Sequence, residues 1–332
     1  MSYPKWIDKL PSEHKPMPIL SFPSAPLMGV SVYALTHDAN IQANGIVRVA
    51  QETNAAAAVT MMDLSLEAEA FGCTLHTSEN EVPTVVGALV TDEDEADELE
   101  IPQVGDARTG LYIEAAKKAK SRITDRPVLA GVIGPFSLAG RLMDVTEALA
   151  NCICDPDFVH AVMRKATPFL IEYAKAYKAA GLDGIVMAEP LSGLLSPALE
   201  EEFSAPYCKE LIDAVQDESF AVIYHNCGPN TPKMTDSLSS LGASAYHFGD
   251  AVQLEEILDK MPADRVVMGN ISPSKQFLGG TPDSMAQAVK ELLEKCAGHK
   301  NFLLSSGCDI PPKSSWDNIR AFFRASEEFY AE

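Results

Sequence analysis

The feature that most constrains the fold is a recurring pattern in which a short apolar run is followed by a longer stretch with helical periodicity. Continuous apolar runs with little polar alternation are typical of parallel strands covered on both faces. The 332 residues contain eight such units, which predicts a (β/α)8 TIM barrel of the α/β class. The expected strands are residues 18–22, 58–62, 128–134, 184–188, 221–225, 243–248, 266–269 and 302–305. The expected helices are residues 41–54, 111–121, 157–180, 197–216, 232–241, 253–260, 282–296 and 315–331.

The same pattern predicts the domain organisation. No internal linker is visible, so we expect a single barrel domain over residues 1–332 with a small N-terminal extension. A doubly wound sheet is the structural alternative, but no glycine-rich nucleotide-binding turn follows the first apolar run. Residues 78–91 indicate a hairpin inserted on the barrel. The acidic run at residues 91–100 (TDEDEADELE) is expected to be a solvated face or loop.

Composition limits the cellular setting and the partners. A net charge of −21 argues against nucleic acid as a partner, because phosphate binding needs positive charge. The seven cysteines lack the spacing of a disulfide framework and indicate a reducing cytoplasm. Residues 1–6 contain no apolar signal-peptide core, and no run approaches membrane-spanning length. We therefore expect a cytoplasmic protein with no membrane partner.

Polar side chains concentrate directly after the expected strands. Barrel enzymes build their active sites at the carboxyl ends of the strands. A barrel with only a structural role would not need this asymmetry, so we expect an enzyme. In chain order the positions are Asp63, residues 134–136, Glu189, His225 with Cys227, residues 247–250, Asn270, and Cys308 with Asp309.

Three of these residues are typical zinc ligands. His225 ends one apolar run, Cys227 follows two residues later, and Cys308 follows another run about eighty residues further on. One imidazole and two thiolates leave a fourth position open, as in catalytic zinc sites, and soft thiolates favour zinc over magnesium or manganese. The alternative is that both cysteines are ordinary core residues, because cysteine is often buried. Each cysteine, however, follows an apolar run and lies in a glycine-containing turn, a combined setting that the other five cysteines lack.

The charge of this ligand set indicates the chemistry. Zinc can lower the pKa of a bound water to about 7, or it can hold a substrate thiol as the thiolate. Two thiolate ligands already neutralise the ion, which weakens it as a Lewis acid toward water. The ligand set therefore favours transfer to a thiol over hydrolysis.

Four further residues are candidates for the site. Glu189 and Asp250 each end an expected strand, and each could complete the zinc coordination or act as base for an incoming thiol, so we assign both as catalytic. The alternatives are that Glu189 caps a neighbouring loop and that Asp250 caps the following helix. Asp63 and Asn270 are assigned to substrate binding, although the acidic patch around Asp63 also fits a structural role. His247 is interpreted as a packed histidine.

With these residues in view, the chain resembles the uroporphyrinogen decarboxylase superfamily, and within it the zinc-dependent methylcobalamin:coenzyme M methyltransferases. The likeness covers nearly the whole chain. Its discriminating part is the H-x-C…C arrangement, because the decarboxylases need no metal. The arginine-bearing N-terminal motif of the decarboxylases is absent, since residues 20–32 contain no arginine. The matching motifs are residues 63–73 (DLSLEAEAFGC), 134–140 (GPFSLAG), 180–190 (AGLDGIVMAEP), 225–228 (HNCG), 267–270 (VMGN), 306–312 (SGCDIPP) and 318–321 (NIRA).

The resemblance implies a (β/α)8 barrel, zinc on His225, Cys227 and Cys308, and a separate corrinoid protein that brings cobalamin to the barrel mouth. No D-x-H-x-x-G corrinoid-binding run occurs in this chain. The implied reaction is attack of a zinc-activated thiolate, of the coenzyme M type, on the methyl group of methylcobalamin, with cob(I)alamin leaving. The sulfonate group of such an acceptor is expected to bind an arginine or lysine near the zinc, but no basic residue directly follows an expected strand.

Several functions stay open at this point. The preferred one is a zinc-dependent methyltransferase that moves methyl between a corrinoid and a small-molecule thiol. A second is a substrate-side methyltransferase that takes methyl from a methoxy, methylamine or halide donor to cob(I)alamin. A third is a metal-free tetrapyrrole decarboxylase, and a non-enzymatic corrinoid- or tetrapyrrole-binding module is the remaining alternative.

Overall fold

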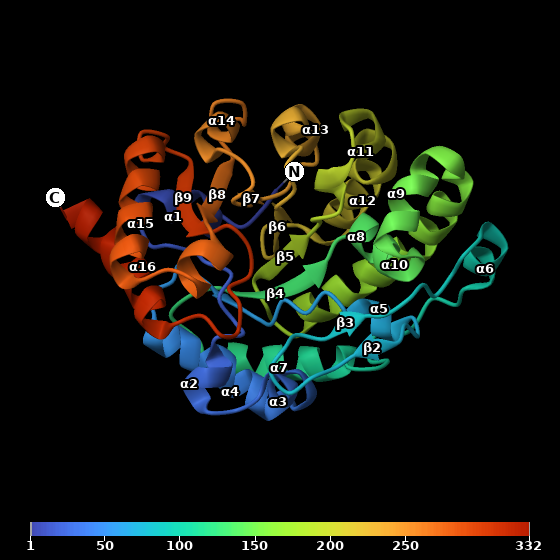
Figure 1. The fold of residues 1–332 in the computed structure, drawn as a ribbon, viewed down its shortest axis with the longest axis horizontal. Coiled ribbons are helices and arrows are strands. Elements are labelled where there is room, and N and C mark those ends of the chain that lie inside the picture. Colours follow the sequence, from blue (N-terminus) through green and yellow to red (C-terminus); the bar gives the residue numbers. More distant parts are fainter. Residues whose placement is uncertain (1, 332) are drawn as a thin grey trace.

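Parallel strands form one curled sheet of seven strands, and helices surround it on the outer side (Figure 1). The computed structural model describes residues 2–331 of the chain. Neighbouring strands in the order β1-β4-β5-β6-β7-β8-β9 are all parallel, which confirms the expected α/β class. The strands are β1 (Ala58–Val59), β4 (Val128–Ile133), β5 (Gly184–Ala188), β6 (Ala221–Asn226), β7 (Ala245–Phe248), β8 (Val266–Ile271) and β9 (Phe302–Ser306).

Each expected helical range contains a helix, and further helices form outside those ranges. Residues 197–216 form two helices instead of one, because a proline in the first turn of the second helix cannot donate a backbone hydrogen bond to the first. No helix within residues 2–331 is both long and apolar enough to cross a lipid bilayer. The helices are α1 (Trp6–Glu13), α2 (Ser24–Met28), α3 (Val32–His37), α4 (Ala39–Glu52), α5 (Leu66–Ala70), α6 (Glu93–Glu98), α7 (Thr109–Lys120), α8 (Pro135–Met143), α9 (Val145–Cys154), α10 (Pro156–Ala179), α11 (Pro197–Phe203), α12 (Ala205–Val215), α13 (Thr235–Ser240), α14 (Leu254–Leu258), α15 (Pro282–Cys296) and α16 (Trp316–Ala331), with short helical turns at Ser192–Leu194, Thr231–Lys233 and Pro273–Leu278.

The first expected strand, residues 18–22, is not formed, so the described residues contain seven strands of the expected eight-stranded barrel. The segment just before it instead bonds to both edges of the sheet. The Met17 N–H donates to the Leu304 carbonyl of β9 at 2.9 Å, and the Pro16 carbonyl accepts from the Ala56 N–H at 2.9 Å. Pro16 and a second proline two residues later have no N–H, so a regular ladder cannot form there.

Two apolar cores hold the sheet in place. The larger one lies between the sheet and the surrounding helices. The smaller one contains strand residues such as Leu129, Ile223 and Met268 together with Ile7 and Leu10 of α1. The small N-terminal extension therefore contributes to the core inside the curled sheet. Burial of such side chains is the main favourable term in folding, worth about 1.5–3 kcal/mol for each large aliphatic residue.

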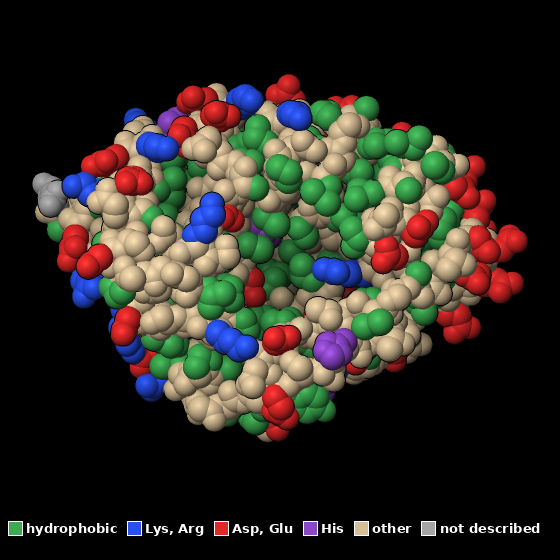
Figure 2. All heavy atoms as spheres, in the orientation of Figure 1, with side chains coloured by type: hydrophobic (Ala, Val, Ile, Leu, Met, Phe, Trp, Pro, Cys, Tyr) green, Lys and Arg blue, Asp and Glu red, His purple; other side chains and the backbone are tan. Residues whose placement is uncertain are grey.

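The chain between β1 and β4 leaves the sheet and forms a separate layer. It contains an antiparallel hairpin, β2 (Leu75–His76) and β3 (Thr84–Val85), which confirms the hairpin expected in this region, although it begins earlier. The acidic run forms α6 rather than a loop, because the Asp92 side chain accepts from the Glu95 N–H and caps the helix. Within α6 the one buried residue is Ala96, and acidic side chains gather on this edge of the molecule (Figure 2).

Glu67 of α5 links this layer to the sheet through a buried carboxyl group. Its Oε1 accepts from the Ile133 N–H of β4 at 3.1 Å, whereas Oε2 has no hydrogen-bond partner among the described residues. Burial raises the pKa of Glu67 to about 8, and the nearby Asp63 contributes in the same direction. The folded protein therefore holds this proton at a pH where the unfolded chain has lost it.

Glu67→Gln is expected to flatten the pH dependence of stability. As pH rises from about 4.5 to about 8, the unfolded chain binds fewer protons at this position than the folded protein does, so the free energy of unfolding falls. Each unit of pKa shift corresponds to about 1.4 kcal/mol, so the wild-type chain should lose a few kcal/mol relative to the variant over this range. Urea denaturation at several pH values measures the difference. The exposed Glu327→Gln is the matched control and should follow the wild type; a parallel fall in E67Q would contradict the assignment.

Candidate metal centre

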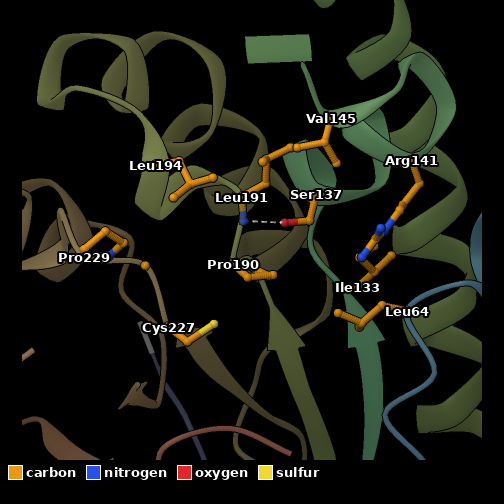
Figure 3. A pocket seen from close by; sticks show the side chains of 11 residues that line it. Leu64, Ile133, Ser137, Arg141, Val145, Pro190, Leu191, Leu194, Cys227 and Pro229 are labelled. Carbon is orange, nitrogen blue, oxygen red and sulfur yellow. Dashed lines mark hydrogen bonds between the residues drawn. The ribbon is translucent and has the colours of Figure 1, made fainter. Parts of the chain in front are cut away.

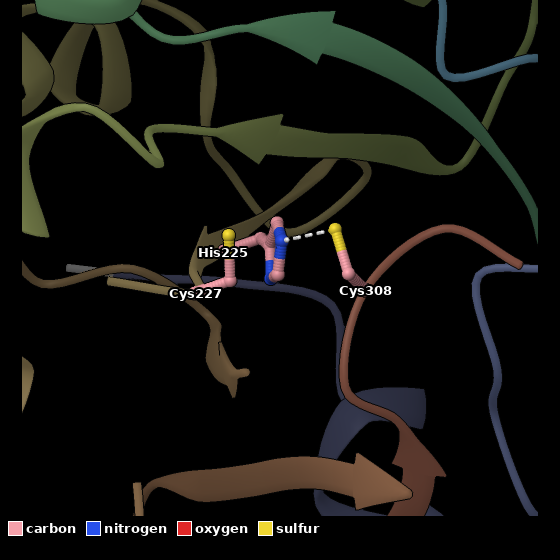
Figure 4. Close-up of side chains that lie close together, drawn as sticks. All are labelled: His225, Cys227 and Cys308. Atoms are coloured by element: carbon pink, nitrogen blue, oxygen red, sulfur yellow. Dashed lines mark hydrogen bonds between the residues drawn. The ribbon is translucent and has the colours of Figure 1, made fainter. Parts of the chain in front are cut away.

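His225, Cys227 and Cys308 converge at the carboxyl edge of the sheet (Figure 4). His225 lies in β6, Cys227 follows the end of that strand, and Cys308 lies in the turn after β9. One ligand atom from each residue lies within 4.8 Å of the other two, and Cys308 Sγ is 3.5 Å from His225 Nε2. His225 is 2% exposed, whereas both cysteines are partly exposed. The cluster is therefore anchored on the sheet side and accessible on the other.

The donor set fits zinc. Zinc–sulfur bonds of about 2.3 Å and zinc–nitrogen bonds of about 2.0 Å separate tetrahedral ligand atoms by about 3.5–3.8 Å. The 3.5 Å between Cys308 Sγ and His225 Nε2 agrees with that edge. The three-residue group contains no carboxylate. Three protein ligands could thus hold a zinc ion and leave one position for a small molecule.

The two thiols are electrostatically coupled through a hydrogen bond. Hydrogen bonding from Cys308 lowers the pKa of Cys227, and the same interaction raises the pKa of Cys308 to about 12, with burial adding to that rise. Of the two thiols, Cys227 is therefore the easier one to deprotonate. A divalent cation that binds here would displace the thiol protons, because thiol ligands bind metals as thiolates.

A chain of hydrogen bonds supports His225 from behind. Its Nδ1 lies 2.8 Å from Nδ1 of His247, which is paired with it across β6 and β7. Nε2 of His247 lies 2.7 Å from Ser305 Oγ, which donates to the Met17 carbonyl at 2.7 Å. Burial, and then the neighbouring His225, lower the pKa of His247 well below its usual value, so its ring is neutral. If His225 Nε2 binds a metal, the hydrogen bonds have one consistent direction. His225 Nδ1–H donates to His247 Nδ1, and His247 Nε2–H donates to the Ser305 hydroxyl.

His247 is the residue that the sequence interpretation undervalued. The ring is 1% exposed, as a packed histidine would be, yet it contacts a metal-ligand candidate. A signal did exist: in parallel strands, residues in register point to the same face, and His225 pairs with His247. Recognising it requires the strand register, which one sequence does not provide.

Two glycines allow the ligand-bearing turns to approach each other. A Cβ atom on Gly249 would lie 2.4 Å from the Cβ of Cys227, so a side chain there would displace the ligand. A Cβ on Gly307 would lie 2.8 Å from the backbone nitrogen of Asp250 and 3.0 Å from its Oδ1. The turns after β6, β7 and β9 are therefore packed directly against one another around the cluster.

Asp250 and Asn270 lie beside the cluster. Asp250 is exposed, and its negative charge acts to raise the pKa of Cys227. Its side chain accepts no hydrogen bond from the helix that follows, since α14 begins at Leu254 with Gln253 at its N-cap. The Asn270 side-chain nitrogen donates to the carbonyls of Gly249 at 2.8 Å and Val252 at 3.0 Å, which ties down the turn after β7.

Glu189 faces the start of α8 and is fully buried. Its Oε2 accepts from the Phe136 N–H at 2.9 Å, and its Oε1 accepts from the Ser137 N–H at 2.6 Å and from the Ser137 hydroxyl. Burial raises the pKa of Glu189 to about 7, against the lowering effect of these hydrogen bonds. Amides at a helix N-terminus stabilise the carboxylate, so Glu189 caps α8 from the neighbouring strand end.

Asp63 is enclosed in a buried polar network. Arg108 donates to Asp63 Oδ2 at 2.8 Å, the Tyr112 hydroxyl donates to the same oxygen at 2.8 Å, and Ser65 donates to Oδ1 at 2.6 Å. The Asp63 side chain is 0% exposed. Arg108 also pairs with Glu69 at 2.6 Å. This arrangement connects the strand end to α7 and leaves Asp63 with no face toward solvent.

A cavity of about 320 Å³ opens beside Cys227 (Figure 3). Most of its walls are apolar, and in the space-filling view hydrophobic side chains line a hollow near the centre of this face (Figure 2). Arg141 of α8 stands on the side opposite Cys227 and is the charged residue of the lining. The sequence interpretation missed Arg141 because it lies in the last turn of a helix, away from the strand ends. The lining residues are Leu64, Ile133, Ser137, Arg141, Val145, Pro190, Leu191, Leu194, Cys227, Gly228 and Pro229.

Comparisons with known proteins agree with the resemblance noted in the sequence. The family model described as uroporphyrinogen decarboxylase (URO-D) matches residues 17–329. The methylcobamide:CoM methyltransferase MtbA of Methanosarcina acetivorans is 26% identical over 271 residues, which cover 80% of this chain and 78% of the relative. The uroporphyrinogen decarboxylase of Christiangramia forsetii is 25% identical over 238 residues, 69% of this chain and 67% of the relative. A solved methyltransferase from Methanosarcina mazei superposes with a TM-score of 0.84 at 22% identity, covering 95% of this chain and 94% of that one, and so shares its fold.

Cys308→Ala is expected to remove metal binding. The protein purified without chelator should carry about one zinc per chain, and the variant should carry close to none, because two ligands hold zinc poorly. Elemental analysis gives the stoichiometry. Cys296→Ala removes a buried thiol from α15, away from the cluster, and should keep the metal. A full zinc complement in C308A would place the metal elsewhere.

His247→Leu should weaken zinc binding roughly 10- to 100-fold, because the hydrogen bond that orients a histidine ligand contributes that much to affinity. His247→Asn should restore most of it, since the amide oxygen can accept from His225 near the position of Nδ1. Competition with a chromophoric chelator measures both affinities. Equal affinity in the wild type and both variants would show that His247 only fills space.

Proposed function

We propose that this chain, which belongs to the uroporphyrinogen decarboxylase family, is a corrinoid-dependent methyltransferase that moves a methyl group between a corrinoid and a thiol. The reacting thiol would lie at the cluster of His225, Cys227 and Cys308, with zinc as the bound metal. Support comes from relatives such as the Methanosarcina acetivorans methylcobamide:CoM methyltransferase, 26% identical over 80% of this chain. The cobalamin would arrive on a separate corrinoid protein, docked where the strands end.

The observation that carries the proposal is a ligand group of one imidazole and two thiols beside an apolar cavity. When bound there, zinc would lower the pKa of an acceptor thiol and keep the thiolate near its ligands. Two thiolate ligands offset the charge of the ion, so an acceptor thiolate stays electron-rich enough to attack carbon. The apolar walls exclude water from the sulfur, which leaves it poorly hydrated and nucleophilic.

The four other candidate residues take different roles in this proposal. Asp250 is the candidate fourth ligand and base, because its carboxylate is exposed beside Cys227 and forms no ion pair within the described chain. An Asp250 carboxylate oxygen would accept the proton of the incoming thiol. Glu189 would act indirectly, by holding the N-terminus of α8 and with it one wall of the cavity. Asp63 and Asn270 would position the surrounding segments rather than contact the substrate.

The acceptor of the preferred reaction is a coenzyme M-like thiol, because the Methanosarcina acetivorans relative is a methylcobamide:CoM methyltransferase. The substrate-side reaction, in which a methoxy, methylamine or halide donor methylates cob(I)alamin, would use the same centre in the opposite direction. A metal-free decarboxylase is the third candidate, because uroporphyrinogen decarboxylases also match this chain. The cysteine–histidine cluster weighs against that candidate, as does the lack of arginine in residues 20–32.

Methylcobalamin is expected to lose its methyl group when the zinc-loaded protein meets a suitable thiol. The absorbance change from methylcobalamin to cob(I)alamin, followed with a panel of thiols, measures the reaction. Cys308→Ala should reduce the rate by at least about 100-fold through loss of thiol activation, whereas Cys296→Ala should leave it unchanged.

The competing functions give different results in parallel assays. Methylation of cob(I)alamin by methoxy or methylamine compounds, with no thiol consumed, would favour the substrate-side reaction. Decarboxylation of uroporphyrinogen that survives chelator treatment and C308A would favour the metal-free enzyme. Either result, together with no thiol-dependent loss of methylcobalamin, would overturn the proposal.

A further inference from the structure

We propose that Arg141 anchors an anionic group, a sulfonate or a carboxylate, on the acceptor thiol and thereby selects which thiols are methylated. The identity of the reacting group, a thiol, rests on the proposed function. The position of Arg141 does not depend on that function, because Arg141 lines the same cavity as Cys227, from the opposite wall (Figure 3). A small thiol could place its sulfur at the cysteines and its other end at the guanidinium.

The Arg141 guanidinium has no partner in the part of the chain that the structure describes. It forms no ion pair and no side-chain hydrogen bond there, and the Cys73 thiol makes a long contact of 3.9 Å to the backbone carbonyl of Arg141 rather than to its guanidinium. Most other arginines behave differently; Arg108, for example, pairs with both Asp63 and Glu69. Arg141 is partly buried, and burial lowers the pKa of its guanidinium. A desolvated charge without a counterion is costly to the folded protein, so a role in binding explains its presence.

Arg141 stands where two cavities meet. The first, about 320 Å³, contains Cys227, and the second, about 250 Å³, lies beneath the β2–β3 hairpin; both are lined by Leu64 and Arg141. Besides Arg141 and Cys227, the polar side chain that lines the first cavity is Ser137, whose hydroxyl is already bonded to Glu189 and to the Leu191 N–H. The second cavity contains Asp309, which accepts from Ser21 at 3.5 Å and forms no ion pair with Arg141.

The chemistry of the two walls defines the ligand. A guanidinium binds a planar carboxylate or a sulfonate with two parallel hydrogen bonds, and such charge-assisted bonds are the strong ones. The apolar surface between Arg141 and Cys227 suits a short alkyl chain. In a chain with a net charge of −21, an unpaired arginine in a cavity is a local exception that attracts anions. The expected acceptor is therefore a short alkyl thiol with an anionic end.

Steady-state kinetics of Arg141→Gln test the inference with three thiols of similar size: 2-mercaptoethanesulfonate, 3-mercaptopropionate and the neutral 2-mercaptoethanol. In R141Q the KM for the preferred anionic thiol should rise roughly 10- to 100-fold with kcat little changed. The KM for 2-mercaptoethanol and the KM for methylcobalamin should change less than about 2-fold. Arg141→Lys keeps the charge without the paired donors and should show a smaller rise. Arg324→Gln, at an exposed position of α16, is the charge-matched control and should match the wild type.

Two further measurements separate the possible failures. Calorimetric titration of ethanesulfonate and propionate into the metal-depleted protein should show binding that R141Q abolishes, and this result does not depend on methyl transfer. Loss of the unpaired charge should leave Tm unchanged or raise it, so a large fall in Tm would show a structural role and overturn the inference. Equal KM values for anionic and neutral thiols in the wild type, or an effect of R141Q on methylcobalamin alone, would also overturn it. Anion binding without any thiol-dependent reaction would instead retain the Arg141 site and reject the proposed function.

Discussion

The convergence of one imidazole and two sulfur atoms at one edge of a curled sheet is the constraint on which the site depends. Cys308 is 83 residues from His225 in the sequence, and its sulfur lies 3.5 Å from the imidazole. Parallel strands make this possible, because every strand ends at the same edge and the turns that follow them meet there. Close packing of Gly249 against Cys227 then fixes the distance. The two cores below the edge supply the rigidity that a metal centre needs.

Most of the fold could be predicted from the sequence, because most strands are marked by a local run of apolar residues. Continuous apolar runs such as residues 128–134 and 184–188 became β4 and β5 almost without change, and residues 282–296 became α15 with the same bounds. The prediction of the first strand was wrong, because the apolar residues at 18–22 indicate that the segment is buried and not that its backbone pairs with a neighbouring strand. The alternating prolines before and within this segment remove the donors of a ladder while leaving the side chains in the core.

The candidate site was predictable to the extent that its residues follow strands. His225, Cys227 and Cys308 come together, and Asp250 and Asn270 lie beside them. Glu189 turned toward α8, because free helix amides are a stronger attraction for a buried carboxylate than an open cavity. His247 and Arg141 were missed for a common physical reason. The role of His247 depends on its contact with His225, and the role of Arg141 depends on the cavity that it shares with Cys227. The periodicity of one sequence carries no information about such contacts in space.

The distribution of charge around the cluster gives the site its character. Away from the cavity, the acidic residues of α6 are solvated, and Asp63 is paired with Arg108. At the metal cluster and its cavity the groups differ: two thiols could ligate a cation, and the Arg141 guanidinium has no ion pair within residues 2–331. Such a site is satisfied only when a cation is present at one end and an anion at the other. Under the proposed function, a molecule with a thiol at one end and an anionic group at the other would supply a partner at each end, so that neither partly buried group is left without its counterpart.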